Sequence, residues 1–544
     1  MGEWWRGCVL YQIYPRSFQD GNGDGIGDIK GISRRLEHVA SLGVDAIWLS
    51  PVFPSPMADM GYDVSNYTDI DPLFGDLADF DAMIAEAHGL GLKVIIDQVL
   101  SHTSEEHPWF VESRLSRDNP KADWYVWVDP EPDGTPPNNW LSIFGGGAWE
   151  WDSRRRQYYF HNFLVQQPDL NLHNPAVQEA VLEAMRFWLE RGVDGFRLDT
   201  VNFYFHDQAL RNNPAAERAD KLPPVNPYEM QHQDFARNRP ENIDFLHRMR
   251  ALLDEYDDRM LVGEVGERGE RSVALMTEYT KGQDRLHMAY SFELLEAAFR
   301  PLDIMRGLRA FFDRGPDSWP CWSFSNHDIV RHVTRWADYG ASQDTLAKLC
   351  AAILVSLRGT VCLYQGEELG LGESELEFEE LTDPPGIRFW PEYKGRDGCR
   401  TPMPWDSSIP SSGFSSVSPW LPVKPPQAKR NVAAQESNAQ SVLHFYRALL
   451  AWRRKRPVLR SGDIEFLELT VPVLAFLRSS KGGSLACAFN MSLDSVKLTV
   501  AGARLDAEAP NQQATLDGGC LTLGPNGFAL LEPKGAAIVT IADA

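Results

Sequence analysis

The segment Gly195-Phe196-Arg197-Leu198-Asp199-Thr200-Val201 is a short apolar run interrupted by an arginine and a carboxylate. It is the fourth of eight such runs, and each is followed by a helix-like stretch. Strand-like and helix-like segments that alternate in this way are typical of parallel sheets. Eight repeats therefore predict an α/β fold, a (β/α)₈ TIM barrel. The other runs are Val9–Arg16, Ala46–Val52, Val94–Leu100, Leu261–Val265, His287–Phe292, Trp322–His327 and Thr360–Tyr364.

The spacing between the runs predicts how the chain is divided. A helix is expected over Pro175–Glu190, because Asn174 can cap it and apolar residues recur at intervals of three and four. Residues 102–171 are too long for a single crossover, so we expect an inserted subdomain after the third strand, over the barrel mouth. The barrel itself is predicted to comprise residues 1–101 and 172–459. Two further long excursions span about 203–240 and 373–427, and barrel enzymes build their sites in such loops.

The last part of the chain has a different sequence pattern. Residues 460–544 contain short runs separated by turn signals and are predicted to form a separate C-terminal all-β domain, a β-sandwich. The predicted strands are Ile464–Leu469, Val473–Arg478, Leu485–Asn490, Val496–Val500 and Ala529–Leu531.

The amino-acid composition indicates which kinds of binding partner and which compartment to expect. The 76 acidic and 53 basic residues give a formal charge of −23, which argues against a nucleic acid or an anionic membrane and favours a small neutral ligand. The seven cysteines include no CxxC pair, which favours free thiols in a reducing compartment. The sequence shows no signal-peptide pattern and no apolar stretch of transmembrane length. We therefore expect a soluble, cytoplasmic protein, with the oligomeric state open between a monomer and a homodimer.

Ionisable residues gather where the predicted strands end. Any one of them could be a helix cap or a turn former. Four independent strands that place such groups at one rim predict an active site instead. The four acids and two histidines are Asp97, His102, Asp199, Glu264, His327 and Asp328.

Three further segments complete a recognisable pattern, namely Gly61-Tyr62-Asp63-Val64, Gln167-Pro168-Asp169-Leu170-Asn171 and Arg400-Thr401-Pro402-Met403-Pro404-Trp405. Together with the strand ends, they make the sequence resemble glycoside hydrolase family 13, the α-amylase family, and especially its α-glucosidase and oligo-1,6-glucosidase branch. The resemblance runs from about Trp4 into the C-terminal domain. It implies a retaining enzyme that acts on α-glucosides through a covalent glucosyl–enzyme.

Carried over to this sequence, the resemblance implies that Asp199 is the nucleophile, Glu264 the general acid/base and Asp328 a stabiliser of the transition state. The residue chemistry agrees, because a retaining glycosidase needs one ionised and one protonated carboxyl group about 5–5.5 Å apart. Arg197 lies two residues before Asp199 on the same side of an extended strand, so its charge is expected to keep the nucleophile ionised. Glu264 is expected to have a raised pKa. Water or a second sugar can attack the intermediate, so hydrolysis and transglucosylation share one site.

For the bound sugar, the resemblance implies hydrogen bonds from His102 and His327 and stacking on Tyr62. Phe144 and Phe163 lie in the inserted subdomain and are candidates for the pocket lining, with buried packing as the alternative.

The resemblance also implies an ion pair of Asp59 with Arg396 that closes the pocket and restricts the enzyme to exo action on short substrates. Arg400 is the alternative partner of Asp59, since both arginines precede the Thr-Pro-Met segment. An ordinary surface ion pair is the competing interpretation.

The segment Asp20-Gly21-Asn22-Gly23-Asp24-Gly25-Ile26-Gly27-Asp28 alternates oxygen-bearing side chains with glycines, which suits a hard cation. It is not an EF-hand, because Gly31 stands where a bidentate Glu is required. In the resembled branch a similar loop holds structural Ca²⁺ or Mg²⁺ through Asp20, Asn22, Asp24, the Ile26 carbonyl and Asp28, whereas the alternative is a solvated acidic turn. Ser101 replaces an Asn that helps to hold another calcium in many family members, so a second site is not expected, nor is an organic cofactor.

Thr200 directly follows the proposed nucleophile. Relatives specific for α-1,6 linkages tend to carry Val there, so the resemblance favours α-1,4 linkages. The 203–240 excursion, with Tyr228, Gln231 and His232, is expected to wall off the aglycone side and to limit substrates to small α-glucosides such as maltose.

Several alternatives stay open. An oligo-1,6-glucosidase and a sucrose-acting transglucosylase or isomerase differ from the favoured α-glucosidase only in the linkage they cleave or in the acceptor they use. A relative of another class keeps the barrel as an inactive scaffold, but such relatives lack the full carboxylate set and carry a membrane span. A pure carbohydrate-binding role is disfavoured, because binding needs no acid opposite a nucleophile.

Overall fold

The computed structural model describes residues 3–217, 224–296, 298–535 and 537–544. At its centre, eight parallel strands follow the order β10-β11-β1-β2-β3-β7-β8-β9. A parallel bridge between Ala289 and Pro320 joins the two ends of this sheet into a barrel. The predicted (β/α)₈ barrel is therefore confirmed. Its strands are β1 (Val9–Ile13), β2 (Ala46–Leu49), β3 (Lys93–Gln98), β7 (Gly195–Leu198), β8 (Met260–Val265), β9 (Met288–Ser291), β10 (Cys321–Trp322) and β11 (Thr360–Tyr364).

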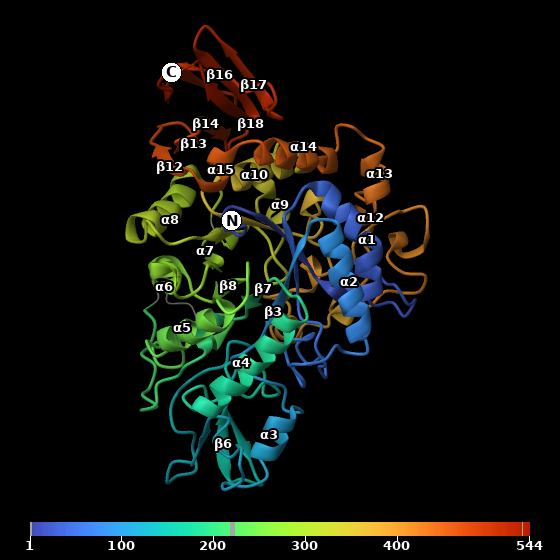
Figure 1. Cartoon of the computed structure of the whole chain (residues 1–544), viewed down its shortest axis with the longest axis vertical. Helices are drawn as coiled ribbons and strands as arrows, with labels where there is room; N and C mark the ends of the chain where they lie inside the picture. The colour runs from blue at the N-terminus through green and yellow to red at the C-terminus, as the bar shows by residue number, and fades with distance from the viewer. Residues whose placement is uncertain (1–2, 218–223, 297, 536) are drawn as a thin grey trace.

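Helices surround the barrel and bury an apolar stripe against it (Figure 1). In α1 the buried residues Ile32, Leu36 and Val39 recur at the spacing of one helix face. The predicted helix over Pro175–Glu190 is present as α4, and the side chain of Asn174 caps it by accepting a hydrogen bond from the Ala176 N–H. The principal helices are α1 (Ile29–Leu42), α2 (Leu77–Gly89), α4 (Pro175–Glu190), α5 (Asn242–Leu253), α6 (Gly269–Thr280), α8 (Pro301–Arg314), α10 (Gln343–Ser356) and α14 (Val442–Arg454).

The predicted barrel strands are correct in place, and Leu261–Val265 and Thr360–Tyr364 also end where β8 and β11 end, but the other six extend too far at their C-terminal ends. The clearest error is the run Trp322–His327, of which only Trp322 is extended strand, in β10. The chain turns after this residue, and the side chain of Asn326 accepts a hydrogen bond from the Asp328 N–H to hold the turn. The turn carries His327 and Asp328 onto the rim of the barrel.

The chain between β3 and α4 forms the predicted inserted subdomain. Its antiparallel sheet has the order β4-β6-β5, built from β4 (Trp127–Val128), β6 (Gln157–Phe160) and β5 (Trp149–Asp152), with α3 (Pro108–Ser113) beside it. Trp140, Trp149 and Phe160 belong to a separate core cluster of this region. In Figure 1 the subdomain lies at one end of the long axis of the molecule.

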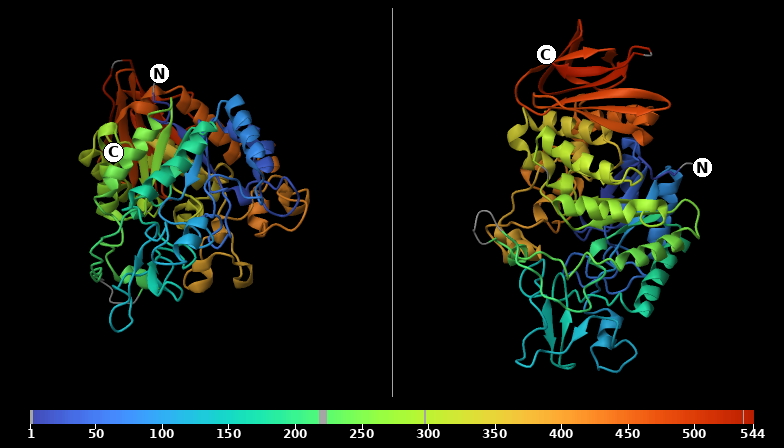
Figure 2. Two further views of the ribbon diagram at one scale, coloured as in Figure 1. Left: turned by 60° about the horizontal axis from the view of Figure 1, so that its bottom comes forward. Right: turned by 90° about the vertical axis from the view of Figure 1, so that its left-hand side faces the viewer.

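The C-terminal region forms an antiparallel sheet at the opposite end of the molecule (Figures 1 and 2). One face of it, including Phe476 and Leu530, joins the main core, whereas Ala475 and Leu521 belong to a second cluster inside the domain. The exact domain boundaries stay predictions. The strands are β12 (Asp463–Leu467), β13 (Val473–Ser480), β14 (Gly483–Asn490), β15 (Val496–Ala501), β16 (Ala503–Leu505), β17 (Gln512–Asp517), β18 (Cys520–Pro533) and β19 (Thr540–Asp543).

Two further predictions concern the cysteines and the membrane. All seven cysteines are free, and all except Cys520 are buried. Among the described residues, no helix has the length and apolar character needed to cross a bilayer.

Arg478 joins the C-terminal sheet to the barrel. Its fully buried guanidinium donates hydrogen bonds to the carbonyls of Ser356 and Leu357, which end α10, and to that of Gly462. Three more carbonyls nearby accept from it, those of Val458, Leu459 and Asp463. One side chain therefore satisfies six buried or partly buried acceptors.

We expect Arg478→Met to lower the free energy of unfolding by about 3 kcal/mol or more, because the carbonyls would stay buried without donors. Urea unfolding followed by tryptophan fluorescence measures this loss. Arg504→Met is the control, since Arg504 forms an exposed ion pair with Glu532 and should change stability by less than about 0.5 kcal/mol. Equal effects of the two substitutions would contradict the role of Arg478.

Candidate active site

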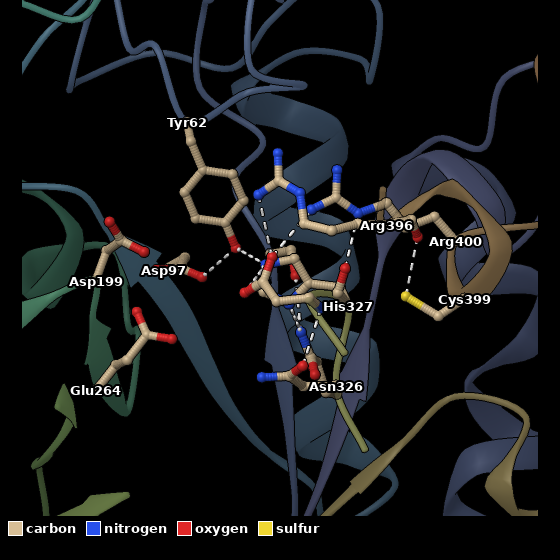
Figure 3. Close-up of polar contacts among 12 residues, drawn as sticks. Tyr62, Asp97, Asp199, Glu264, Asn326, His327, Arg396, Cys399 and Arg400 are labelled. Atoms are coloured by element: carbon tan, nitrogen blue, oxygen red, sulfur yellow. Dashed lines mark hydrogen bonds and ion pairs between the residues drawn. The ribbon is translucent and has the colours of Figure 1, made fainter. Parts of the chain in front are cut away.

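Four neighbouring strands, β3, β7, β8 and β9, build the centre of the site. Their parallel register sets Asp97 beside Arg197 and Glu264 beside Tyr290. Asp199 follows the last residue of β7, and its carboxyl group lies next to that of Glu264 (Figure 3). The side chains meet at the rim formed by the C-terminal ends of the strands, where barrel enzymes place their catalytic groups.

The guanidinium of Arg197 is the centre of these contacts and is fully buried. Its Nη1 lies 2.7 Å from Oδ1 of Asp97 and 2.6 Å from Oδ1 of Asp199, and its Nη2 lies 2.7 Å from Oε2 of Glu264. Its Nε and Nη2 also donate to the hydroxyl of Tyr290, at 3.0 and 2.8 Å. One cation therefore faces three carboxyl groups.

Burial raises the pKa of these carboxyl groups, to about 7 for Asp199 and Glu264 and to about 6 for Asp97, while Arg197 opposes the rise. The raised pKa of Glu264 agrees with the expectation from the sequence. The expectation that Arg197 keeps Asp199 ionised needs correction. The ion pair with Arg197 lowers the pKa of Asp199, but burial and the repulsion of Asp97 raise it by more. The cluster consequently retains a proton close to neutral pH.

Asp328 has a contrasting environment. Its Oδ1 lies 3.0 Å from Nη2 of Arg400 and 3.3 Å from Nη1 of Arg396. Although burial opposes ionisation, His327 and the two arginines hold the pKa of Asp328 well below its usual range. Burial lowers the pKa of His327 itself to about 3, so at neutral pH the arginines supply the positive charge. Asp328 is therefore ionised at neutral pH, and its side chain is 19% exposed.

The rings of Tyr62 and His327 are nearly parallel, and the Tyr62 hydroxyl is directed at the His327 ring (Figure 3). Their ring centroids are 5.3 Å apart with an interplanar angle of 5°. The Tyr62 hydroxyl lies 2.6 Å from Nε2 of His327 and donates to Oδ2 of Asp97 at 3.1 Å. His102 is placed nearby, with its Nε2 3.0 Å from the Tyr62 carbonyl oxygen. Burial lowers the pKa of His102 to about 4, so both histidines are neutral hydrogen-bonding groups at neutral pH.

Asp59 pairs with Arg396 and not with Arg400. The distance from Nη2 of Arg396 to Oδ1 of Asp59 is 2.8 Å. The same Nη2 lies 2.6 Å from Oδ1 of Asp383, which holds the guanidinium in place, and Arg400 instead donates from Nε to the His327 carbonyl at 2.7 Å. The ion pair is buried and lies beside Asp328, to which Arg396 also pairs.

The two phenylalanines of the subdomain both reach this region. The guanidinium of Arg396 lies 5.1 Å from the ring centroid of Phe144, and the Phe163 ring lies 5.0 Å from that of His102. Phe203 packs behind Phe163 at 5.4 Å. Phe163 is therefore a largely buried ring packed between His102 and Phe203, and its part in lining a pocket stays a prediction.

Thr200 adopts left-handed backbone angles, φ 37° and ψ 51°, which are unusual for a β-branched residue and cost about 1–3 kcal/mol. In this conformation its N–H donates to Oε2 of Glu264 at 3.0 Å and its hydroxyl donates to Oδ2 of Asp199 at 3.2 Å. The hydroxyl of Ser101 is 3.3 Å from that of Thr200. The bend after β7 thereby connects the two carboxyl groups.

The excursion after β7 is described except for residues 218–223. Tyr228 faces Arg237 at 5.6 Å, and Arg237 stacks on Phe203 at 4.8 Å, so Tyr228 is connected to the wall of the site. Gln231 donates to the Asn139 carbonyl of the subdomain. The His232 N–H donates to the Pro214 carbonyl within the excursion.

The predicted metal loop is a compact turn in which backbone N–H groups bond to Asp20 and Asp28. Asp28 also caps α1. Asp24 accepts from the Ile26 N–H and from the Asn22 amide. Among the described residues no group of three His, Cys, Asp or Glu side chains converges as a metal cage. The loop nonetheless collects three carboxylates and gives none of them a basic partner within the described chain.

Sequence reasoning missed Tyr290, Asp383 and Trp48. Tyr290 lies within the predicted run His287–Phe292, but its pairing with Glu264 depends on the register of β8 and β9, which no sequence pattern gives. Trp48 lies in β2 and donates from Nε1 to Asp97 at 3.2 Å. Asp383 lies in an irregular loop that carries no periodic signal.

Residues 12–462 match the family model of the α-amylase catalytic domain. A probable α-glucosidase of Rhizobium meliloti is 61% identical over 495 residues, which is 90% of each chain. An oligo-1,6-glucosidase of Heyndrickxia coagulans is 38% identical and covers 91% of this chain and 93% of its own.

Two solved structures share the whole fold. The α-glucosyl transfer enzyme XgtA is 53% identical, with a TM-score of 0.95, and covers 98% of this chain and 100% of its own. The trehalulose synthase MutB of Pseudomonas mesoacidophila is 31% identical, with a TM-score of 0.86 and the same coverage. The strand-end carboxyl groups, the barrel and these relatives lead to one conclusion. The chain belongs to the α-amylase family, glycoside hydrolase family 13, and is a glycoside hydrolase.

Proposed function

We propose that this protein is a retaining, exo-acting α-glucosidase that hydrolyses short α-glucosides such as maltose. The observation that carries the proposal is that Asp199 and Glu264 share the guanidinium of Arg197 and the backbone and hydroxyl of Thr200. This arrangement holds the two carboxyl groups close together, as retention through a covalent intermediate requires.

In the proposed reaction, the Asp199 carboxylate attacks the anomeric carbon while Glu264 gives its proton to the departing oxygen. Since the cluster retains a proton near neutral pH, one carboxyl can be ionised while the other is protonated. Glu264 then removes a proton from water, which attacks the glucosyl–Asp199 ester and frees the nucleophile. A sugar hydroxyl in place of water gives transglucosylation at the same site.

The other contacts support binding of one terminal glucose. In the proposal, the Asp59–Arg396 pair closes the pocket and the Asp328 carboxylate accepts hydrogen bonds from sugar hydroxyls. The ring nitrogens of His102 and His327 already contact protein groups, so these histidines bond to a sugar only by exchanging one of those contacts. A closed pocket favours short chains over long ones. Turnover of maltoheptaose as efficient as that of maltose would argue against this.

Preference for α-1,4 linkages rests on Thr200 and stays part of the proposal. Cleavage of α-1,6 linkages and transfer or isomerisation of sucrose are the second candidates, because an oligo-1,6-glucosidase and a trehalulose synthase are among the relatives. We further propose that the protein works in the cytoplasm on diffusible small glucosides, in line with its free thiols.

The activity is tested by incubating the enzyme with maltose, isomaltose and sucrose and following the anomeric form of the released glucose by NMR. We expect α-glucose to appear first, fastest from maltose. Asp199→Asn should lower kcat by at least about 10³-fold, because it removes the nucleophile and no other group replaces it. Initial release of β-glucose would contradict retention, and equal inertness of wild type and variant would favour the scaffold alternative.

We also propose that the Asp20–Asp28 loop binds Ca²⁺, or Mg²⁺, structurally. Oxygen ligands and carboxylates without a basic partner in the described chain fit a hard cation, which would stabilise the turn that starts α1 and take no part in the reaction. Added CaCl₂ should raise the midpoint of thermal unfolding by a few degrees after EDTA treatment, as expected for a ligand that binds only the native state. Asp24→Asn should remove this shift, and a shift that persists in the variant would place the ion elsewhere.

A further inference from the structure

Tyr290 is a buried tyrosine beside Glu264. The two residues are direct neighbours in the β8–β9 ladder, and Tyr290 is 5% exposed. Its hydroxyl lies 3.1 Å from Oε1 of Glu264 and accepts hydrogen bonds from Nε and Nη2 of Arg197. The phenol thus connects the cation of the site to Glu264.

The direction of the hydrogen bonds follows from these contacts. A phenol has one O–H donor and accepts through its lone pairs. Since two N–H groups of Arg197 occupy the accepting side, the hydroxyl hydrogen points to Glu264. Burial raises the pKa of Tyr290 well above its usual value, so the hydroxyl keeps this hydrogen over the range in which the enzyme works.

The two oxygens of Glu264 are not equivalent. Oε2 faces Nη2 of Arg197 at 2.7 Å and the N–H of Thr200 at 3.0 Å. Oε1 accepts from Tyr290 only, among the hydrogen bonds of the described chain. Because fewer donors face Oε1, this is the oxygen that can carry the exchangeable proton of the Glu264 carboxyl group.

We propose that Tyr290 is a positioning residue for Glu264, whose hydroxyl fixes the rotation of the carboxyl group and directs the proton on Oε1 toward the glycosidic oxygen. The inference rests on the role proposed above for Glu264. As the glycosidic C–O bond breaks, its electron pair stays on the departing oxygen, which takes the Oε1 proton. The carboxylate that remains is stabilised by the donor hydroxyl of Tyr290.

The consequence is a defined pH effect. Glu264 is faced by Arg197 and Asp199 from β7 and its end, by Asp97 of β3 and by Asp328 after β10. Tyr290→Phe leaves these groups in place and removes one donor to the carboxylate, which raises the pKa of Glu264. The alkaline limb of kcat/KM, where the acid loses its proton, should therefore move upward by about one pH unit.

The experiment compares the pH profiles of wild type and Tyr290→Phe on maltose and on p-nitrophenyl α-glucoside. We expect the upward shift, together with a loss of kcat/KM about tenfold larger on maltose, because nitrophenolate leaves with little help from an acid. Site-specific 2,3-difluorotyrosine at position 290, a stronger donor, should move the limb to lower pH. Tyr446→Phe is the matched control, since Tyr446 is fully buried and its hydroxyl has no hydrogen-bond partner among the described residues.

An unchanged limb in both Tyr290 variants, with equal losses on the two substrates, would overturn the inference and leave Tyr290 a packing residue. The variant Glu264→Gln distinguishes failure of the inference about Tyr290 from failure of the proposed function. The alkaline limb should vanish in that variant, and a limb that survives would mean that Glu264 is not the acid.

Discussion

The buried guanidinium of Arg197 is the interaction on which the site depends. Removing three carboxyl groups from water is costly unless a cation and hydrogen bonds compensate them, and here a single side chain contacts Asp97, Asp199 and Glu264. The arrangement requires β3, β7 and β8 to be adjacent and in register, because each supplies one corner of the cluster. By placing these strands side by side, the barrel brings the cation next to the carboxyl groups and offsets the cost of burying them.

Arg197 compensates the negative charge of the three acids only in part, and this suits the cluster to acid–base catalysis. One cation for three acids leaves the pKa values of Asp199 and Glu264 near neutrality, whereas two arginines keep Asp328 ionised. Carboxyl groups of the same chemistry thus receive different protonation states from their surroundings. The strained backbone of Thr200 serves the same end, because it brings an N–H to Glu264 and a hydroxyl to Asp199.

The barrel could be predicted from the sequence because its strands are buried on both faces and read as apolar runs, and α4 could be predicted because Asn174 and Pro175 mark its start. The ends of the strands could not, since β10 stops at Trp322 although the predicted run continues to His327. Local patterns do not record where long loops meet in space. The pairing of Asp59 with Arg396 and not Arg400, the part played by Asp383 and the contact of Tyr290 with Glu264 all arise from segments that are far apart in the sequence and meet only in the folded chain.

The most direct test of the account is the pH dependence of stability in Arg197→Gln. The carboxyl groups around Arg197 have folded-state pKa values above those of the unfolded chain, and loss of the cation raises them further. The stability deficit of the variant should be small near pH 4, where these carboxyl groups are protonated in the folded wild type and in the folded variant alike, and should grow as the pH rises toward 8. We predict that the difference in thermal unfolding midpoint between wild type and variant widens by several degrees over this range. A difference that stays constant or shrinks with rising pH would contradict the account and make Arg197 a packing residue.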